Sequence, residues 1–239
     1  MLQIKNVTKK FGSFTAVNNL NLNIKAGDFF GFLGQNGAGK TTTIKMISGL
    51  YNATSGNISI GGFDIYKEPI KAKSLIGYIP DQPFVYEKLT GREFLFFSGG
   101  LYSIEKNKLK KIIDEVIEKL EIGDWVDKRT EEYSQGMKQR ITIASALLHD
   151  PKLLVVDEPM VGLDPQSSVI VKNILKEKAK NGVAIFMSTH SLNVAEEICT
   201  KIGIIKDGNM IFSDDTIVLE TIRGSDHQNL ESLFLHLTK

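Results

Sequence analysis

The sequence feature that most constrains this chain is an eight-residue, glycine-rich run: Gly34-Gln35-Asn36-Gly37-Ala38-Gly39-Lys40-Thr41. It matches the pattern G-x-x-x-x-G-K-[ST] without a gap. Residues 28–33, before it, are an apolar run typical of a buried strand, and residues 42–50, after it, carry apolar side chains at helical spacing. Between a strand and a helix, such a loop points successive backbone N–H groups at one anion, and the helix N-terminus adds its positive pole. The run therefore predicts a phosphate-binding loop.

The last two residues of this loop predict its chemistry. Lys40 is expected to reach the β- and γ-phosphates of a nucleotide, and the Thr41 hydroxyl to hold Mg²⁺. The alternative is a glycine turn followed by an incidental lysine. At average residue frequencies the full pattern arises by chance in about one chain in a hundred. Nucleotide binding is the favoured interpretation.

Composition limits the remaining classes. The 239 residues are 42% hydrophobic, enough for one large core with a small inserted subdomain. A net charge of +1 favours neither nucleic acid nor an anionic membrane as the partner. Cys199 is the sole cysteine, which suits a reducing compartment. Because no apolar run reaches membrane-spanning length and no signal peptide is recognisable, we expect a soluble intracellular domain that can still dock on a membrane protein.

Strand patterns change along the chain. Residues 2–11, 17–24 and 58–60 alternate apolar and polar side chains, and their short connections predict antiparallel pairing. Residues 153–156 and 183–187 are continuous apolar runs, as expected for inner strands of a parallel sheet. Phe11, after the first strand, could stack on a base or pack in the core; the pattern alone leaves both open.

Helical patterns dominate residues 84–149. Thr90 and Glu93 form the sequence signature of a capping box, and residues 109–120 carry an apolar stripe at 3.6-residue spacing. A third helix is predicted from about Gln135, and its start is a second potential anion site. Four aromatic residues in this region could form a docking surface, but subdomain core is favoured: Phe94, Phe96, Phe97 and Tyr102.

Three candidate catalytic residues follow predicted parallel strands. Asp157 and Glu158 end the strand at residues 153–156, and His190 follows the strand at residues 183–187. Ligands of open α/β sheets bind at this carboxyl edge. Adjacent carboxylates point in different directions, so one can serve Mg²⁺ while the other reaches a water molecule. Histidine is more often structural, but its place on this edge favours a functional role.

In order and spacing, these motifs resemble those of the ATP-binding subunit of ABC transporters, as far as about Asp215. Residues 34–41 are similar to the family's Walker A motif, 153–158 to Walker B, 162–164 to the D-loop, and His190 to the switch histidine. Residues 133–137, Tyr-Ser-Gln-Gly-Met, stand where the signature Leu-Ser-Gly-Gly-Gln is usual, and this variant resembles the branch that drives ABC-2-type exporters. Ser134 and Gly136, which make the family's γ-phosphate contacts, are retained.

The resemblance implies a fold and a domain division. The fold is an α/β P-loop NTPase core with a mostly parallel sheet, an N-terminal antiparallel β-subdomain and an inserted α-helical subdomain at about residues 84–149. The expected ATPase domain covers residues 1–215. Beyond the resemblance, the sequence of residues 216–239 predicts a short C-terminal helical extension with one or two helices.

The resemblance also implies residue roles, with ATP and Mg²⁺ as cofactors. Glu158 polarises the attacking water, and Lys40 and His190 stabilise the γ-phosphate. The residues implied to bind the nucleotide, with Phe11 as the adenine-stacking aromatic, are Phe11, Gly34, Gln35, Asn36, Gly37, Ala38, Gly39, Lys40, Thr41, Thr42, Ser134 and Gly136. The residues expected to hold or approach Mg²⁺ are Thr41, Asp157 and Gln82. The ungapped register puts Asp81 where the family's Q-loop glutamine usually stands, with Gln82 one place later, so either side chain can fill this role.

The implied partners are a second ATP-binding subunit, arranged head to tail as a homodimer, and an integral-membrane permease; no nucleic acid is expected. The implied location is cytoplasmic, peripheral on the inner face of the cell membrane. Two rival classes are a soluble ABC-type ATPase not tied to transport and a P-loop kinase. The first usually joins two such domains or inserts long coiled coils, and this sequence shows neither. The second needs a lid and an acceptor pocket, and it has no use for the motif from Tyr133 to Arg140.

Overall fold

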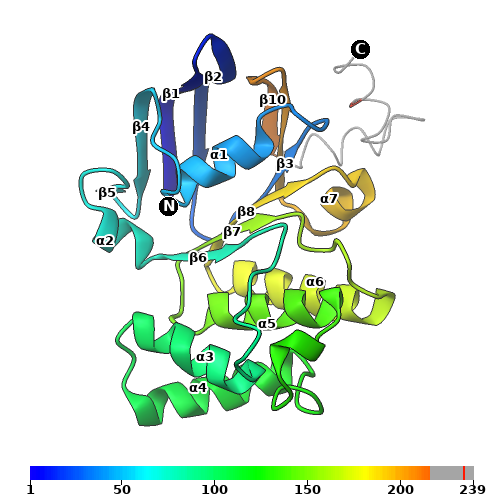
Figure 1. The fold of residues 1–239 in the computed structure, drawn as a ribbon. Coiled ribbons are helices and arrows are strands. Elements are labelled where there is room, and N and C mark those ends of the chain that lie inside the picture. The colour runs from blue at the N-terminus through cyan, green and yellow to red at the C-terminus, as the bar shows by residue number, and fades with distance from the viewer. Residues whose placement is uncertain (216–233, 235–239) are drawn as a thin grey trace.

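The computed structural model describes residues 1–215 and residue 234 (Figure 1). In chain order its elements are β1 (Leu2–Phe11), β2 (Phe14–Ile24), β3 (Phe29–Leu33), α1 (Lys40–Ile47), β4 (Ser55–Ile60), β5 (Phe63–Asp64), α2 (Pro69–Lys73), β6 (Ile76–Ile79), α3 (Gly91–Leu101), α4 (Lys106–Lys119), η1 (Thr130–Glu132), α5 (Gln135–Leu147), β7 (Leu153–Asp157), α6 (Pro165–Lys180), β8 (Ala184–Thr189), α7 (Leu192–Ile198), β9 (Lys201–Lys206) and β10 (Asn209–Asp215). The short helices predicted for residues 216–239 lie outside the described residues, apart from Phe234, which packs against the main core.

A six-stranded, mostly parallel sheet lies at the centre, in the order β10-β9-β3-β8-β7-β6. Strands β9, β3, β8, β7 and β6 are mutually parallel, and β10 is antiparallel to β9 at one edge. Every residue of β3 and β7 is buried, which explains why these strands are continuous apolar runs rather than alternating ones. The parallel sheet predicted from the sequence is confirmed.

A second sheet, in the order β2-β1-β4-β5, is antiparallel throughout. Phe11 and Phe14 pair across a two-residue turn in which Gly12 has φ +59°, a conformation that glycine adopts without strain. The predicted antiparallel β-subdomain is therefore confirmed. The strand β3 follows β2 after a short turn but leaves this sheet, because it pairs on both sides with parallel strands.

Two cores cover the two faces of the central sheet. Helix α1 packs between the two sheets, with Ile44, Met46 and Ile47 buried among residues of β1, β2 and β4. Helices α3, α4, α5 and α6 cover the opposite face, in the lower half of Figure 1. The strand ends that carry the candidate catalytic residues thus project from a sheet fixed on both faces. Among the described residues, no helix has the length and apolar character needed to cross a bilayer.

The helices α3, α4 and α5 fall within the predicted helical region. The predicted capping box is present: the Thr90 hydroxyl accepts a hydrogen bond from the Glu93 N–H at 3.2 Å, and the Glu93 carboxylate accepts one from the Thr90 N–H at 2.8 Å. Phe94 and Phe96 pack in the core as favoured, but Phe97 is 45% exposed and Tyr102 is 41% exposed. The aromatic cluster is therefore part core and part surface.

Candidate active site

The glycine-rich loop joins β3 to α1 and depends on its glycines. Gly37 has φ +83° and Gly39 has φ +111°, both in the left-handed region that favours glycine. A Cβ on Gly34 would lie 2.6 Å from the Ile205 carbonyl oxygen, and a Cβ on Gly39 would lie 2.6 Å from that of Ala16. The loop can therefore adopt this close backbone path only with glycine at these positions.

Lys40, the first residue of α1, is held inside this loop. Its side chain is almost fully buried, and its ammonium donates hydrogen bonds to the carbonyl oxygens of Gly34 at 2.7 Å and Gln35 at 3.1 Å. Burial lowers the pKa of Lys40, whereas the charges of Glu158 and Asp157 raise it. A phosphate oxygen could replace a loop carbonyl as the partner of this ammonium, and the exchange would pair the buried cation with an anion.

Asp157 lies at the carboxyl end of β7 and is 1% exposed. The Ser188 hydroxyl donates to its Oδ1, while its buried Oδ2 has no hydrogen-bond partner among the described residues. Burial raises the pKa of Asp157, whereas the nearby hydroxyls of Ser188 and Thr41 lower it. A carboxylate oxygen with unused lone pairs beside a threonine hydroxyl is a donor set that suits Mg²⁺, a hard cation with oxygen ligands. The residues present therefore fit this metal.

Glu158 and His190 form a second polar pair at the same sheet edge. The Nδ1 of His190 lies 2.8 Å from the Oε1 of Glu158. The Glu158 side chain is mostly buried, whereas that of His190 is largely exposed. Glu158 has φ +46°, a left-handed conformation that is uncommon outside glycine and is often found at functional sites. The two adjacent carboxylates have different partners, Ser188 for Asp157 and His190 for Glu158.

A cavity of about 430 Å³ brings most of these groups together. Its lining residues are Phe14, Ala16, Asn36, Gly37, Gly39, Lys40, Thr41, Thr42, Asp81, Asp157 and Glu158. Of the remaining predicted residues, Gly34 and Gln35 hold Lys40, Ala38 is buried within the loop, and His190 bonds to Glu158. Asp81 lines the cavity and Gln82 does not.

Two lining residues, Phe14 and Ala16, were not predicted from the sequence. Both lie at the start of β2, two positions apart and so on one face of the strand. The expected aromatic, Phe11, is outside this lining; its ring packs edge-on against Tyr51 at 5.8 Å between centroids. The signal that could have pointed to Phe14 is its place opposite Phe11 across a two-residue turn.

The second predicted anion site also lies outside this cavity. Ser134 is the N-cap of α5, and its hydroxyl accepts a hydrogen bond from the Met137 N–H at 3.2 Å. The chain at Gly136 packs closely on the segment after β7, since a Cβ there would lie 3.0 Å from the Gly162 carbonyl oxygen. Ser134 is exposed, so its hydroxyl is available to another molecule.

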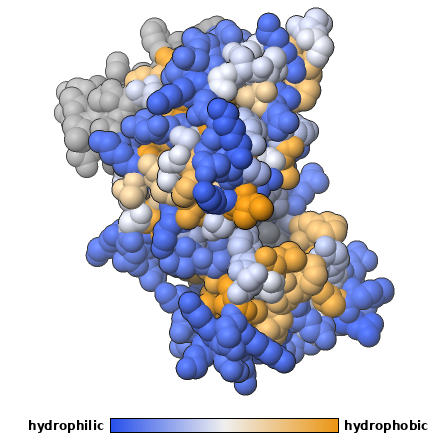
Figure 2. All heavy atoms as spheres, turned by 90° about the vertical axis from the view of Figure 1, so that its left-hand side faces the viewer, coloured by the Kyte–Doolittle hydropathy of each residue, from blue (hydrophilic) through white to orange (hydrophobic). Residues whose placement is uncertain are grey.

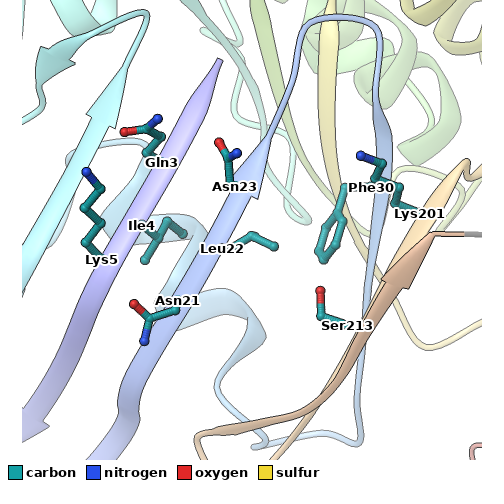
Figure 3. A pocket seen from close by; sticks show the side chains of 9 residues that line it. All are labelled: Gln3, Ile4, Lys5, Asn21, Leu22, Asn23, Phe30, Lys201 and Ser213. Atoms are coloured by element: carbon teal, nitrogen blue, oxygen red, sulfur yellow. The ribbon is translucent and has the colours of Figure 1, made fainter.

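A larger cavity, of about 570 Å³, lies elsewhere, beside β1, β2, β3 and β10 (Figure 3). Its lining is Gln3, Ile4, Lys5, Asn21, Leu22, Asn23, Phe30, Lys201 and Ser213. It contains none of the motif residues and no carboxylate, and Lys201 is 3.1 Å from Asp28 in an ion pair. Size therefore does not identify the reactive site; the smaller cavity has the groups that phosphate chemistry needs.

The fold and the smaller cavity define a class of protein. A glycine-rich loop before a helix, with a lysine in the loop and a buried aspartate at a neighbouring strand end, is the architecture of P-loop nucleoside triphosphatases. The family model for ABC transporters matches residues 17–161, more than half of the chain. The chain belongs to the ABC transporter family, as an ATP-binding, ATP-hydrolysing subunit.

Similar proteins agree with this assignment. The chain is 40% identical over 235 residues to the linearmycin resistance ATP-binding protein LnrL of Bacillus subtilis (strain 168), covering 94% of this chain and 76% of that protein. It is 41% identical over 212 residues to the bacitracin transport ATP-binding protein BcrA of Bacillus licheniformis, and this match covers 88% of this chain and 68% of that protein. A solved ATP-binding subunit of an ABC transporter superposes over the full length of both chains, with a TM-score of 0.92 and 28% identity. A dimeric ATP-binding cassette bound to ADP and phosphate matches with a TM-score of 0.83 and 28% identity, over 90% of this chain and 98% of that one.

Proposed function

We propose that two copies of this chain bind two Mg-ATP molecules head to tail, hydrolyse them and drive a membrane permease. The observation that carries this proposal is the arrangement around Glu158. Its carboxylate borders the cavity that also contains Lys40 and Asp157, and it is hydrogen-bonded to His190. A carboxylate and a cation thus border one cavity, which supports a site for phosphate hydrolysis.

Each of these residues has a separate task in the proposed reaction. Glu158 holds the attacking water and accepts its proton as the oxygen attacks the γ-phosphorus and the bond to ADP breaks. Lys40 stabilises the negative charge on the β- and γ-phosphate oxygens. His190 positions the Glu158 carboxylate through the 2.8 Å contact and adds a donor for the γ-phosphate. Asp157 and Thr41 hold Mg²⁺, which when bound neutralises phosphate charge and orients the triphosphate.

The position of Ser134 supports the dimer. Its hydroxyl and the N-terminus of α5 suit an anion, yet neither Ser134 nor Gly136 lines the cavity of their own chain. A second copy, arranged head to tail, can supply these groups to the γ-phosphate. The related dimeric cassette bound to ADP and phosphate supports the same assembly.

Asp81 is the residue that we propose for the Q-loop role. It lines the cavity with Asp157 and Glu158, and its charge contributes to the raised pKa of Asp157. Gln82, the alternative, is exposed outside that lining. The carboxylate of Asp81 is therefore the better placed of the two to approach the metal and the water.

An exposed hydrophobic surface beside the Q-loop supports a permease partner. Phe84, Tyr86, Phe97 and Leu101 are 69%, 46%, 45% and 70% exposed. The Tyr86 ring packs edge-on against those of Phe84 and Phe97, and Figure 2 shows hydrophobic side chains gathered over this helical half of the molecule. We propose that a permease segment covers this surface, which places the subunit on the inner face of the cell membrane. The named roles of LnrL and BcrA support an exporter of the ABC-2 type.

The proposal is tested first by Lys40→Ala. Loss of the cationic contact to the β- and γ-phosphates should abolish ATP hydrolysis and weaken nucleotide binding. Lys45→Ala on the same helix is the matched control, because Lys45 contacts the Tyr51 ring outside the cavity. Hydrolysis by Lys40→Ala at the rate of the control would refute the proposed site.

A fractionation experiment separates a transporter subunit from a soluble ABC-type ATPase. If a permease is the partner, the chain should follow membranes in cells that contain the permease and leave them when it is deleted. Distribution to the soluble fraction in both strains would favour the soluble ATPase.

A further inference from the structure

Positive charge gathers in one part of the chain, although the net charge of the whole chain is only +1. Residues 1–79, which contain β1 to β6, α1 and α2, have nine lysines and three acidic residues, a formal charge of +6. The remaining residues have a formal charge of −5. Because salt screens charges over about 8 Å in the cell, a partner meets the charge of the surface it approaches and not the sum over the chain. The low net charge therefore leaves room for an anionic partner of this part.

Helix α2 carries the most exposed large apolar side chain among the described residues, Ile70, which is 86% exposed. Leu50 and Tyr51, which follow α1, are exposed as well. The two segments are fixed to each other, because the Lys73 ammonium donates a hydrogen bond to the Gly49 carbonyl oxygen at 3.1 Å. We call residues 45–53 and 63–73 together the α2 surface.

Lysines lie beside the apolar groups of the α2 surface. The Lys45 ammonium lies 5.3 Å from the centre of the Tyr51 ring, and the Lys71 ammonium lies 5.3 Å from that of Phe63. Lys9, from β1, places its ammonium 5.6 Å from the Tyr51 ring. Lysine stems that cover apolar and aromatic groups, with ammonium heads towards the solvent, are typical of surfaces that lie against a membrane interface.

The two acidic residues of the α2 surface have partners within the protein. The Asp64 carboxylate accepts hydrogen bonds from the Asn57 amide and from the backbone N–H groups of Tyr66 and Lys67. Glu68 pairs with Lys71 at 3.0 Å in an exposed ion pair, a kind that contributes little to stability and can be exchanged for another anion. With Lys9 included, the surface has five lysines and these two acids, a formal charge of +3.

The α2 surface continues the hydrophobic surface that we propose for the permease. Ser74, the C-cap of α2, and Tyr102, the C-cap of α3, line one cavity of about 220 Å³. Figure 1 shows α2 and the end of α3 on the same left-hand side, and Figure 2 views the molecule from that side. Since a permease spans the bilayer, a subunit docked through this side has the α2 surface turned towards the membrane.

We propose that the α2 surface binds anionic phospholipid headgroups of the inner leaflet while the subunit is docked on its permease. This inference rests on the proposed function, because the permease contact sets the orientation. Each lysine near an anionic bilayer raises the affinity by about fivefold, so a surface charge of +3 predicts a preference of about 100-fold for anionic over neutral lipid. Ile70 adds apolar contact at the headgroup boundary.

Co-sedimentation of the full chain with vesicles tests the electrostatic part. One set of vesicles is phosphatidylcholine alone, and the other is an equal mixture of phosphatidylcholine and phosphatidylglycerol. The double variant Lys67→Gln with Lys71→Gln should bind the mixed vesicles about 25-fold more weakly than the wild type, the scale of two lost lysine contacts. ATP hydrolysis in solution should be unchanged, because neither lysine lines the nucleotide cavity.

A matched control separates the α2 surface from the charge of the whole chain. The double variant Lys176→Gln with Lys180→Gln removes the same charge from α6, which packs in the core on the opposite face of the central sheet from α2. Lys176, like Lys71, takes part in an exposed ion pair. This control should bind the mixed vesicles with nearly the affinity of the wild type.

A spectroscopic measurement tests the contact of Ile70 with lipid. Ile70→Trp should show a blue-shifted tryptophan emission with the mixed vesicles and quenching by brominated phospholipid. The native tryptophan, Trp125, packs against Tyr133, and the wild-type titration supplies its baseline. Because Ile70 is exposed, its replacement leaves no cavity in the core. Unchanged emission of Ile70→Trp on bound vesicles would contradict the proposed contact.

Several outcomes would overturn the proposal. Equal affinity of the wild type for the two kinds of vesicle, no binding to either, or an equal loss in the α6 control would each remove the α2 surface as a lipid site. Displacement from the mixed vesicles by a short single-stranded RNA at equal phosphate concentration would assign the surface to nucleic acid. The vesicles contain no permease, so these failures would leave the permease-dependent fractionation and the Lys40→Ala result standing and are distinguishable from failure of the proposed function.

Discussion

Replacement of Asp157 by asparagine should stabilise the protein while removing its metal-dependent activity. The carboxylate is 1% exposed, and its Oδ2 has no hydrogen-bond partner among the described residues. Asparagine has nearly the same shape, and its amide oxygen can still accept the Ser188 hydroxyl. The substitution therefore removes a buried charge with little change in packing.

The magnitude follows from two opposing terms. Leaving a buried polar group unsatisfied costs about 1–3 kcal/mol, and more when the group is charged. The loss of attraction to the Lys40 ammonium, whose pKa Asp157 raises, offsets part of the gain. We expect a net stabilisation of about 1 kcal/mol, which corresponds to a rise of about 2–4 °C in the Tm of a chain of this size.

The gain should depend on pH. Burial raises the pKa of Asp157 in the folded state above its ordinary value of 3.8. Between these two pKa values the folded state binds more protons than the unfolded state, so the free energy of unfolding falls as pH rises through that window. The penalty is complete above the folded pKa and is absent below pH 3.8. The stability advantage of Asp157→Asn should therefore be full above the folded pKa of Asp157 and shrink as the pH falls from there towards 3.8.

Differential scanning calorimetry without nucleotide, at neutral and acidic pH, measures this advantage. Asp81→Asn is the control, because Asp81 lines the same cavity but is exposed. In the activity assay, Asp157→Asn should lose Mg²⁺-dependent hydrolysis. A lower Tm at neutral pH, or a Tm gain that grows towards acid, would refute the reasoning about the buried carboxylate.

Two further predictions concern the Q-loop and the capping box. Asp81→Ala should lower ATP hydrolysis more than Gln82→Ala, because Asp81 lines the cavity and Gln82 does not; equal rates for the two variants would contradict that assignment. Thr90→Ala removes the N-cap of α3 and should lower the free energy of unfolding by about 1 kcal/mol, while Thr90→Ser should retain stability. Urea denaturation measures the second effect, and equal midpoints for the two Thr90 variants would show that the hydroxyl does not stabilise α3.

Much of this fold was predictable because the signals are local. The apolar runs of β3 and β7 reflect full burial, and Thr90 with Glu93 marks the start of α3 in the sequence alone. The phosphate loop is equally explicit, since its glycines are required by the backbone path. Short elements such as β5 and α2 were not predicted, because two to five residues carry too little periodicity.

Residues brought together from distant segments were harder to predict. The Ser188 hydroxyl bonds to Asp157 only because β7 and β8 are neighbours in register. Likewise, motif position left Asp81 and Gln82 open. The choice between these two neighbours depends on the turn of the backbone after β6, which brings Asp81 to the lining of the cavity. Sequence patterns do not encode that geometry strongly enough.

The central claim is that ATP is held between two copies of this chain, and Glu158→Gln tests it most directly. This change keeps the shape of the side chain but removes the base, so hydrolysis should fall by roughly 10²-fold or more while binding survives. Since ATP that binds the dimer better than the monomer stabilises the dimer by mass action, light scattering after size exclusion should show a monomer without nucleotide and a dimer with ATP. Adding Ser134→Arg should return the protein to monomer. An ATP-bound monomer of Glu158→Gln at high protein concentration would contradict the homodimeric site.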